Sequence, residues 1–561
     1  MFNPSRVLDW LGEHNPQFFR EAKGRLKSRN IGLAIAFSVA AQLLILQAFN
    51  SFLPNTNKEG IFNRYCLGSP PPNTYNPNNI SDNYCLHDLL GNWMLNWQLW
   101  WLDIFLTISA VAIIALLVAG TYLLVADLSK EEGRGTLNLI RLSPQPAKNI
   151  LLGKLLGVPI LLYFPVCLAI PLNLVAGLAA GIPLVLILAF YLTLAAGCTC
   201  LYRGALLFGL VASGWGGLQN WLAAGAVWWL STMATTLATQ GFWATHTPFD
   251  WLTTFYPGMA LSYGVNSTYL PVKTATAFSG NKLGDLLWYG QPLWNNAVTG
   301  IGFMLLNYFI WSYWLEQGLE RRFRNGNSTL FTKKQSYQIT ACFIVLSSGF
   351  ALQSLEANQL MENFGILQVF IAIFICSLIA VLIPQRQALQ DWARYRYKIR
   401  SSRRNLIREL ILGEKSPITL AIALNLGLMG VYLVPLILLL CLNKLLIIIS
   451  LLLGANVLVI CAAIAQQVIL FSIPKSKFFA ALAVGSFVIL PPIFLVFTGI
   501  QSQTLPLPWL STILPLVALK EASSRAIIFS ALGQWLVIAL LNFQMARQLQ
   551  KISASNYKLA G

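Results

Sequence analysis

The chain has 561 residues, of which 56% are hydrophobic and only 10% are charged, and its formal net charge is +18. Soluble domains carry about 25% charged residues, so this composition excludes an ordinary soluble globular protein. Apolar runs such as 31–49 and 104–126 are close to the roughly 20 residues needed to cross about 30 Å of hydrocarbon. The sequence therefore predicts an all-α, polytopic integral membrane protein.

Residues 1–30 precede the first apolar run and contain a basic segment. In that segment Phe18, Phe19, Ala22 and Leu26 alternate with lysines and arginines. This pattern predicts a basic amphipathic helix that lies on the inner membrane surface. A charged flank that only stops translocation is the alternative interpretation.

The apolar runs predict about twelve transmembrane helices in two six-span units, residues 31–317 and 338–546. Residues 318–337 form a cytoplasmic linker between the units, and residues 547–561 form a cytoplasmic tail. A break at the glycines 214, 216 and 217 of the fifth run would change the count by one or two. The spans are expected near 31–50, 103–126, 151–173, 182–202, 205–238, 297–317, 338–355, 364–384, 417–442, 445–471, 478–500 and 524–546.

The lysines and arginines set the orientation of these spans. With a cytoplasmic N-terminus, 31 of the 38 cations fall in inner segments and seven in outer ones, as the positive-inside rule requires. We therefore expect cytoplasmic N- and C-termini in a plasma (inner) membrane. The net charge reflects this topology and attraction to anionic membrane lipid, and it does not indicate nucleic-acid binding.

The outer segments carry two further signals. Cys66 and Cys85 lie in the polar outer loop 51–98, where an oxidising compartment permits a disulfide between them. The outer segment 241–296 is rich in aromatic residues, which suits either an interfacial belt or helices that cap a pathway. The remaining C-x-C pair, Cys198 and Cys200, has no partner ligands nearby, so a metal site is not expected.

The sequence has no recognisable catalytic apparatus. Its ionisable residues near the apolar runs, Asp103, Asp127, Glu316 and Lys444, lie at span ends, although buried ionisable groups usually mark function in membranes. It has no phosphate-binding loop of the G-x-x-x-x-G-K-[ST] type. We therefore expect no enzymatic activity, no metal and no cofactor, and energy for any uphill transport must come from another polypeptide.

The stretch 129–154, "SKEEGRGTLNLIRLSPQPAKNILLGK", is strongly polar between two apolar runs. Residues 127–139 can extend the second span into the cytoplasm and carry Glu131 and Glu132 into solvent. Gly135 and Ser143-Pro144 then turn the chain back to the membrane. An ordinary solvated loop with a proline turn is the alternative.

This stretch resembles the inner-loop signature of type-2 ABC transporter permeases, which has an acidic pair, Gly-Thr-Leu, Ser/Thr-Pro and an Ile-Leu-x-Gly-Lys re-entry. It departs from that pattern at Gly133, where an acid is expected. A shorter likeness, "LGEKSP", recurs at 412–417, so the second unit is either a working or a divergent copy. The residues that match are Glu131, Glu132, Gly135, Thr136, Leu137, Ser143, Pro144, Ile150, Leu151, Gly153 and Lys154, and in the second loop Gly413, Glu414, Lys415, Ser416 and Pro417.

The resemblance implies a non-catalytic permease subunit of an ATP-driven exporter. Its inner loops would contact a separate ABC ATP-binding subunit, present in two copies. The cargo is not identified, and few fixed charges suit a lipid-like or amphipathic molecule. A secondary carrier or channel without ATP coupling and a membrane scaffold are the alternatives.

Overall fold

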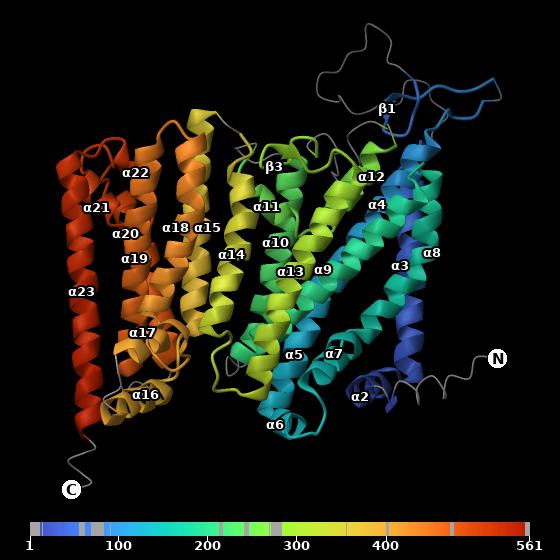
Figure 1. Ribbon diagram of the computed structural model, residues 1–561. Coiled ribbons are helices and arrows are strands. Elements are labelled where there is room, and N and C mark those ends of the chain that lie inside the picture. The colour runs from blue at the N-terminus through green and yellow to red at the C-terminus, as the bar shows by residue number, and fades with distance from the viewer. Residues whose placement is uncertain are drawn as a thin grey trace. The chain divides into compact units, whose positions relative to one another are not determined.

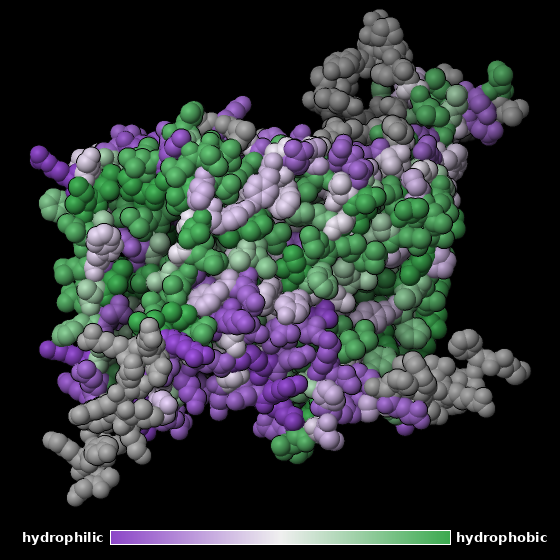
Figure 2. Space-filling view, viewed as in Figure 1, coloured by the Kyte–Doolittle hydropathy of each residue, from purple (hydrophilic) through white to green (hydrophobic). Residues whose placement is uncertain are grey.

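The structure is a computed structural model, and it describes residues 12–13, 15–54, 62–68, 83–89, 91–212, 217–240, 246–268, 270, 283–354, 356–399, 403–471 and 476–555. Within these residues, ten helices are long and apolar enough to cross a membrane. The prediction of an all-α, multi-pass membrane protein is therefore confirmed. Hydrophobic residues cover the middle of the helices, whereas hydrophilic residues gather at the helix ends (Figure 2).

The chain divides into two compact units between Arg324 and Asn325, a point inside the predicted linker 318–337. The short segments 246–249 and 287–291 of the predicted outer loop belong to the second unit. Each unit is a bundle of long helices, drawn from blue to green and from yellow to red in Figure 1.

The first unit contains α2 (Pro16–Arg25), α3 (Ser28–Ser51), β1 (Phe62–Asn63), β2 (Asn83–Tyr84), α4 (Trp97–Ile114), η1 (Ala115–Ala119), α5 (Gly120–Gly133), α6 (Thr136–Arg141), α7 (Ala147–Gly157), α8 (Ile160–Ala179), α9 (Leu184–Val211), α10 (Leu218–Gln240), α11 (Asp250–Thr253), α12 (Gly258–Asn266) and α13 (Ala297–Arg324). The second contains α14 (Lys333–Ala351), α15 (Ala357–Leu382), α16 (Arg386–Ile399), α17 (Arg403–Leu412), α18 (Thr419–Leu440), α19 (Lys444–Leu470), α20 (Ser476–Phe497), α21 (Pro506–Leu510), α22 (Leu516–Leu519) and α23 (Ser524–Ser555). The strands β3 (Leu287–Trp288) and β4 (Gln291–Pro292) form a hairpin.

Two of the twelve predicted spans are helices that fall outside the ten. The run 338–355 corresponds to α14, which begins at Lys333 and buries polar residues such as Thr340 and Ser347. The run 205–238 corresponds to α10, which begins only at Leu218. Neither contains a described stretch that is both long and apolar enough to count among the ten, so length and composition alone do not assign them to the membrane.

The predicted boundary between the fourth and fifth spans is wrong. Helix α9 continues through Arg203 to Val211, because arginine is a good helix former and its guanidinium pairs with Glu316 at 3.3 Å. The next helix, α10, begins directly after Gly217, which has a φ of +92°. Glycine reaches this left-handed region without steric cost.

The third span also begins later than predicted. The run 151–173 contains two helices, because α7 ends at Gly157 and Pro159 precedes α8. Proline lacks the backbone N–H that would continue the hydrogen bonding of α7. Lys154 is therefore outside the span, in a separate helix beside it.

The second span is the longest helical segment of the first unit. Helices α4 and α5 join through the π-helical turn η1 into one segment of 37 residues, Trp97–Gly133. In its most apolar window 61% of the residues are buried, against 6% in α3, so this helix is central and α3 is peripheral. The Tyr202 hydroxyl of α9 donates a hydrogen bond of 2.6 Å to the Leu116 carbonyl inside the π-helical turn.

A small cap covers the N-terminal end of α4, which the sequence predicts to face outward. The structure joins Cys66 to Cys85 by a disulfide with a Cα–Cα distance of 4.9 Å, so the cysteine pair expected from the sequence is bonded here. Next to it, the fully buried Asp103 accepts hydrogen bonds from Arg64 Nε at 3.0 Å and from the Tyr65 hydroxyl at 2.9 Å. These contacts attach the cap to α4.

Candidate functional site

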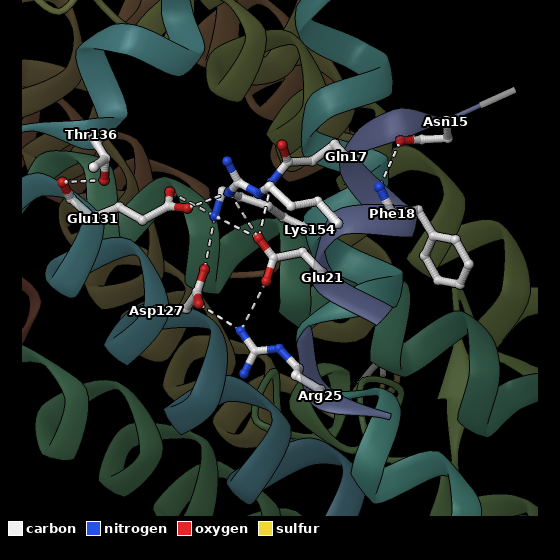
Figure 3. Close-up of polar contacts among 10 residues, drawn as sticks. Asn15, Gln17, Phe18, Glu21, Arg25, Asp127, Glu131, Thr136 and Lys154 are labelled. Atoms are coloured by element: carbon white, nitrogen blue, oxygen red, sulfur yellow. Dashed lines mark hydrogen bonds and ion pairs between the residues drawn. The ribbon is translucent and has the colours of Figure 1, made fainter. Parts of the chain in front are cut away.

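Three helices of the first unit bring six charged side chains together at the end predicted to be cytoplasmic (Figure 3). Asp127 and Glu131 are four residues apart on α5, and Glu21 and Arg25 are four apart on α2. Residues at this spacing share one helix face. The other two members are Arg20 of α2 and Lys154 of α7. We call these six residues the ion-pair cluster.

Lys154 is the centre of the ion-pair cluster. Its ammonium nitrogen lies 2.8 Å from Asp127 Oδ2, 2.7 Å from Glu131 Oε2 and 3.7 Å from Glu21 Oε1. Its side chain is only 1% exposed. A buried charge is stable only when it is paired and hydrogen-bonded, and three carboxylates meet that need.

Two arginines close the ion-pair cluster from α2. Arg25 Nη2 lies 2.6 Å from Asp127 and 3.1 Å from Glu21. Arg20 Nη2 lies 2.7 Å from Glu131 and 3.0 Å from Glu21. Three cations thus balance three anions, and helices α2, α5 and α7 are joined through charge-assisted contacts, which are stronger than neutral hydrogen bonds.

Helix α2 fits directly onto α7 at Gly153. A β-carbon at this position would lie only 2.7 Å from the Phe18 backbone nitrogen, so a larger residue would separate the helices. Asn15 fixes the start of α2, because its Oδ1 accepts from the Phe18 N–H at 2.9 Å and its Nδ2 donates to the Asn149 carbonyl at 2.8 Å. The buried residues of α2 include Gln17 and Glu21, so its buried face is partly polar.

The three carboxylates also have the arrangement of a possible metal site, since their ligand atoms lie within 4.8 Å of one another. Oxygen-only ligand sets suit Mg²⁺ or Ca²⁺. Here the Lys154 ammonium is already in contact with these oxygens. A divalent cation would have to displace a buried lysine, so the residues fit an ion-pair junction better than a metal centre.

The structure separates the predicted coupling-loop residues into three groups. Gly153, Lys154 and Glu131 join α7 and α5 to α2. Thr136 donates to the Glu131 carbonyl at 3.1 Å, and Leu137 is buried in the core. The remaining four, Glu132, Gly135, Ser143 and Pro144, are exposed or half-buried in the turns around α6.

The prediction that Glu131 lies in solvent is wrong. Its side chain is 14% exposed and contacts both Lys154 and Arg20. The error has a physical reason: Arg20 of α2 and Lys154 of α7, which are distant from Glu131 in the sequence, both contact its carboxylate. Glu132, on the next position of the helix, is exposed as predicted.

Helix α6 forms the tip of the loop between α5 and α7 (Figure 1). Gly135 precedes it with a φ of +71°, a conformation that favours glycine. Leu139 is 69% exposed and Leu142 is 82% exposed. Figure 2 shows the resulting hydrophobic patch at the tip, beyond a band of hydrophilic residues.

The second predicted coupling loop is built differently. Most of the predicted loop 385–416 consists of helices α16 and α17. Glu414 and Lys415 are exposed, Gly413 is half-buried, and Ser416 and Pro417 are buried. The Ser416 hydroxyl lies 2.7 Å from the Glu409 carbonyl oxygen. The two Ser-Pro steps therefore have different environments.

Lys333 holds this second loop in place. Its ammonium donates to the Leu410 carbonyl at 2.8 Å, to Ser416 Oγ at 2.7 Å and to the Pro417 carbonyl at 2.8 Å. It is 2% exposed, and it makes no ion pair among the described residues. Burial without a counter-ion lowers the pKa of Lys333 to about 7.

Five residues of these two sites were not predicted from the sequence: Arg20, Glu21, Arg25, Asp127 and Lys333. The i, i+4 spacing of Glu21 with Arg25 on a short amphipathic helix is a usable signal for a polar inward face. No sequence pattern identified Lys333 as a site residue, because a lysine near a helix start usually lies in solvent.

Comparison of the chain with protein-family models, with curated proteins and with solved structures gave no match.

Proposed function

We propose that the chain is the membrane permease subunit of an ATP-driven ABC exporter, with no catalysis of its own. A separate ABC ATP-binding subunit, in two copies, binds at the cytoplasmic end and supplies the energy. In this proposal α10 and α14 also cross the membrane, which gives six spans to each unit. Both termini are cytoplasmic, the membrane is the plasma (inner) membrane, and the cargo is lipid-like or amphipathic.

The observation that carries this proposal is the exposed apolar tip of α6. Leu139 and Leu142 project from a short helix in a strongly polar neighbourhood. Large apolar side chains that gather at one exposed site mark interaction surfaces. At this end of the protein, a partner that covers them would be a cytoplasmic subunit.

The connection of α6 to the spans supports coupling. On one side α6 follows the 37-residue helix Trp97–Gly133, and on the other side it precedes α7. The ion-pair cluster joins both neighbours to α2. A displacement of α6 would therefore move a central span, because the helices around it are held together by paired charges.

A test of this proposal replaces the two exposed leucines. In Leu139→Ser/Leu142→Ser, the protein should insert and fold normally but should no longer retain the ATP-binding subunit when it is purified from native membranes. The matched control is Leu67→Ser/Leu89→Ser, which changes two leucines of similar exposure, 53% and 106%, at the predicted outer end. The control should retain the partner.

Two results would overturn the proposal. One is retention of a full complement of ATP-binding subunit by the Leu139→Ser/Leu142→Ser variant. The other is uptake or release of a solute by the purified chain alone in proteoliposomes, driven by an ion gradient. That second result would identify a secondary carrier.

A further inference from the structure

A cavity of about 350 Å³ lies in the second unit, among helices α15, α18 and α19. This volume is within the range of roughly 300–1,000 Å³ that is usual for small-molecule sites. Its lining includes Gln368 and Ala372 of α15, Gly427 and Gly430 of α18, and Asn456 of α19. These residues lie near the middle of their helices.

The polar groups at this cavity already have protein partners. Gln368 Nε2 donates to the Ser450 carbonyl at 3.0 Å, and its Oε1 accepts from Ser450 Oγ at 2.7 Å. Asn456 Nδ2 donates to Gln534 Oε1 at 3.0 Å. None of the described lining residues is charged. The cavity therefore suits a ligand that needs no hydrogen bonds.

Two glycines create the opening. A β-carbon at Gly427 or at Gly430 would meet nothing within 4 Å, whereas one at Gly454 would overlap the Gln368 side chain. Glycine is unfavourable in a helix interior compared with alanine. Of these three glycines, only Gly454 is required by close packing against a neighbouring side chain. Gly427 is exposed, so the cavity opens on the surface of α18.

The position of the cavity, halfway along three apolar helices, indicates which kind of ligand it binds. Helices α15, α18 and α19 are candidate spans with mean hydropathies of 2.7, 2.2 and 2.8, and their middles lie at the level of the hydrocarbon. A water molecule there would need two to four polar partners, which this lining does not offer. We propose that the cavity binds an acyl chain of a membrane phospholipid. This inference does not depend on the proposed coupling to an ATPase.

The experiment uses the full chain in nanodiscs of phosphatidylglycerol and phosphatidylcholine. A trace of phospholipid carries a diazirine in the middle of one acyl chain, and the cross-linked peptides are identified by mass spectrometry after illumination. We expect cross-links to concentrate on the cavity-lining parts of α18 and α19. Cross-links from general contact with the bilayer should instead spread over all exposed helix faces at this depth, since free lipid contacts the whole apolar surface.

A pair of variants makes the test specific. Gly427→Leu/Gly430→Leu places side chains in the opening, where a β-carbon meets nothing within 4 Å, and should lose the cavity cross-links. Gly485→Leu/Gly533→Leu is the matched control on α20 and α23, because a β-carbon at either glycine also meets nothing within 4 Å and neither lines the cavity. The control should keep the cross-links.

Several outcomes would overturn the inference. They are cross-links spread evenly over the exposed faces of α18, α20 and α23, and cavity cross-links that persist in Gly427→Leu/Gly430→Leu. Cross-links from the cavity to a second copy of the chain would show a protein interface instead. If the double leucine variant does not fold, the distribution of cross-links over the helices of the unsubstituted protein still decides between a site and bilayer contact.

Discussion

Two buried lysines, one in each unit, hold neighbouring segments together by different chemistry. Lys154 is surrounded by the carboxylates of Glu21, Asp127 and Glu131. Lys333 is surrounded by two carbonyl oxygens and a hydroxyl. The first lysine is balanced by charge and joins three helices, whereas the second is only hydrogen-bonded and joins a helix start to a loop.

This difference bears on whether the second unit is a working copy of the first. Both loops contain a Ser-Pro step before a long apolar helix, but Ser143-Pro144 lies at the surface and Ser416-Pro417 is buried under Lys333. A buried step offers no surface for a partner. We infer that the first loop is the better candidate for docking, and the following predictions test the comparison.

The largest effect on stability is expected from Lys154→Met. It leaves three carboxylates with two arginines in a poorly solvated site, and removing one partner of a buried ion pair costs about 3–5 kcal/mol. Thermal unfolding in detergent should show a large loss of stability, and Asp127→Asn in the same chain should restore part of it. Lys148→Met is the control, since Lys148 lies on the same helix and is 67% exposed. An unchanged melting temperature for Lys154→Met would show that the ion-pair cluster does not stabilise the first unit.

Gly153→Leu should have the next largest effect. The side chain would meet the Phe18 backbone nitrogen and the Gln17 side chain, and forced overpacking costs about 1–3 kcal/mol. We expect α2 to separate from α7 and to become sensitive to protease. Gly133→Leu provides the comparison, because a β-carbon there meets nothing within 4 Å. Equal protease resistance of the two variants would contradict the contact between α2 and α7.

Lys333 should make the free energy of unfolding depend on pH. Burial lowers its pKa from 10.5 to about 7, so between these values the unfolded chain binds a proton that the folded chain has released. The free energy of unfolding therefore rises with pH across this window, by at most about 1.4 kcal/mol per pH unit, and is lower below pH 7. Lys333→Met should remove this slope in melting curves recorded from pH 7 to 10, while Lys415→Met, an exposed neighbour, should keep it. A slope that persists in Lys333→Met must come from other groups.

The smallest effects on stability are expected from charge reversals at the exposed acids. Glu132→Lys and Glu414→Lys should each change the free energy of unfolding by no more than about 0.5 kcal/mol. Their effects on partner binding should differ, since a like charge at a docking surface can cost several kcal/mol of association. Under the proposed function, Glu132→Lys should lose the ATP-binding subunit in purification from native membranes and Glu414→Lys should keep it. The reverse result would assign docking to the second loop.

Hydropathy predicted most of the helices but not all of their ends. The run 445–471 matches α19 within one residue, because long uninterrupted apolar segments leave little freedom. The errors occur at Arg203 and Pro159. Helix α9 continues past the paired Arg203, where a loop was expected. Pro159 divides an apolar run that hydropathy treats as uniform.

The candidate site was only partly predictable for a related reason. Gly153 and Lys154 were identified through the resemblance of one contiguous stretch. Their partners on α2 are more than a hundred residues away, as the 3.7 Å contact between Lys154 and Glu21 illustrates. No local pattern specifies which face of α2 packs against α7, since that choice depends on tertiary contacts.

The π-helical turn at Ala115–Ala119 sets the angular phase of the helix that follows it. Each residue of an α-helix turns the chain by about 100°, since 3.6 residues complete a turn, and a π-helical turn holds one residue more. The directions in which Asp127 and Glu131 point therefore depend on one extra residue about two turns earlier. Deleting Val118 would convert this turn to an ordinary α-turn and rotate α5 by about 100° relative to α4. Both carboxylates would then point away from Lys154 although no residue of the ion-pair cluster had been changed.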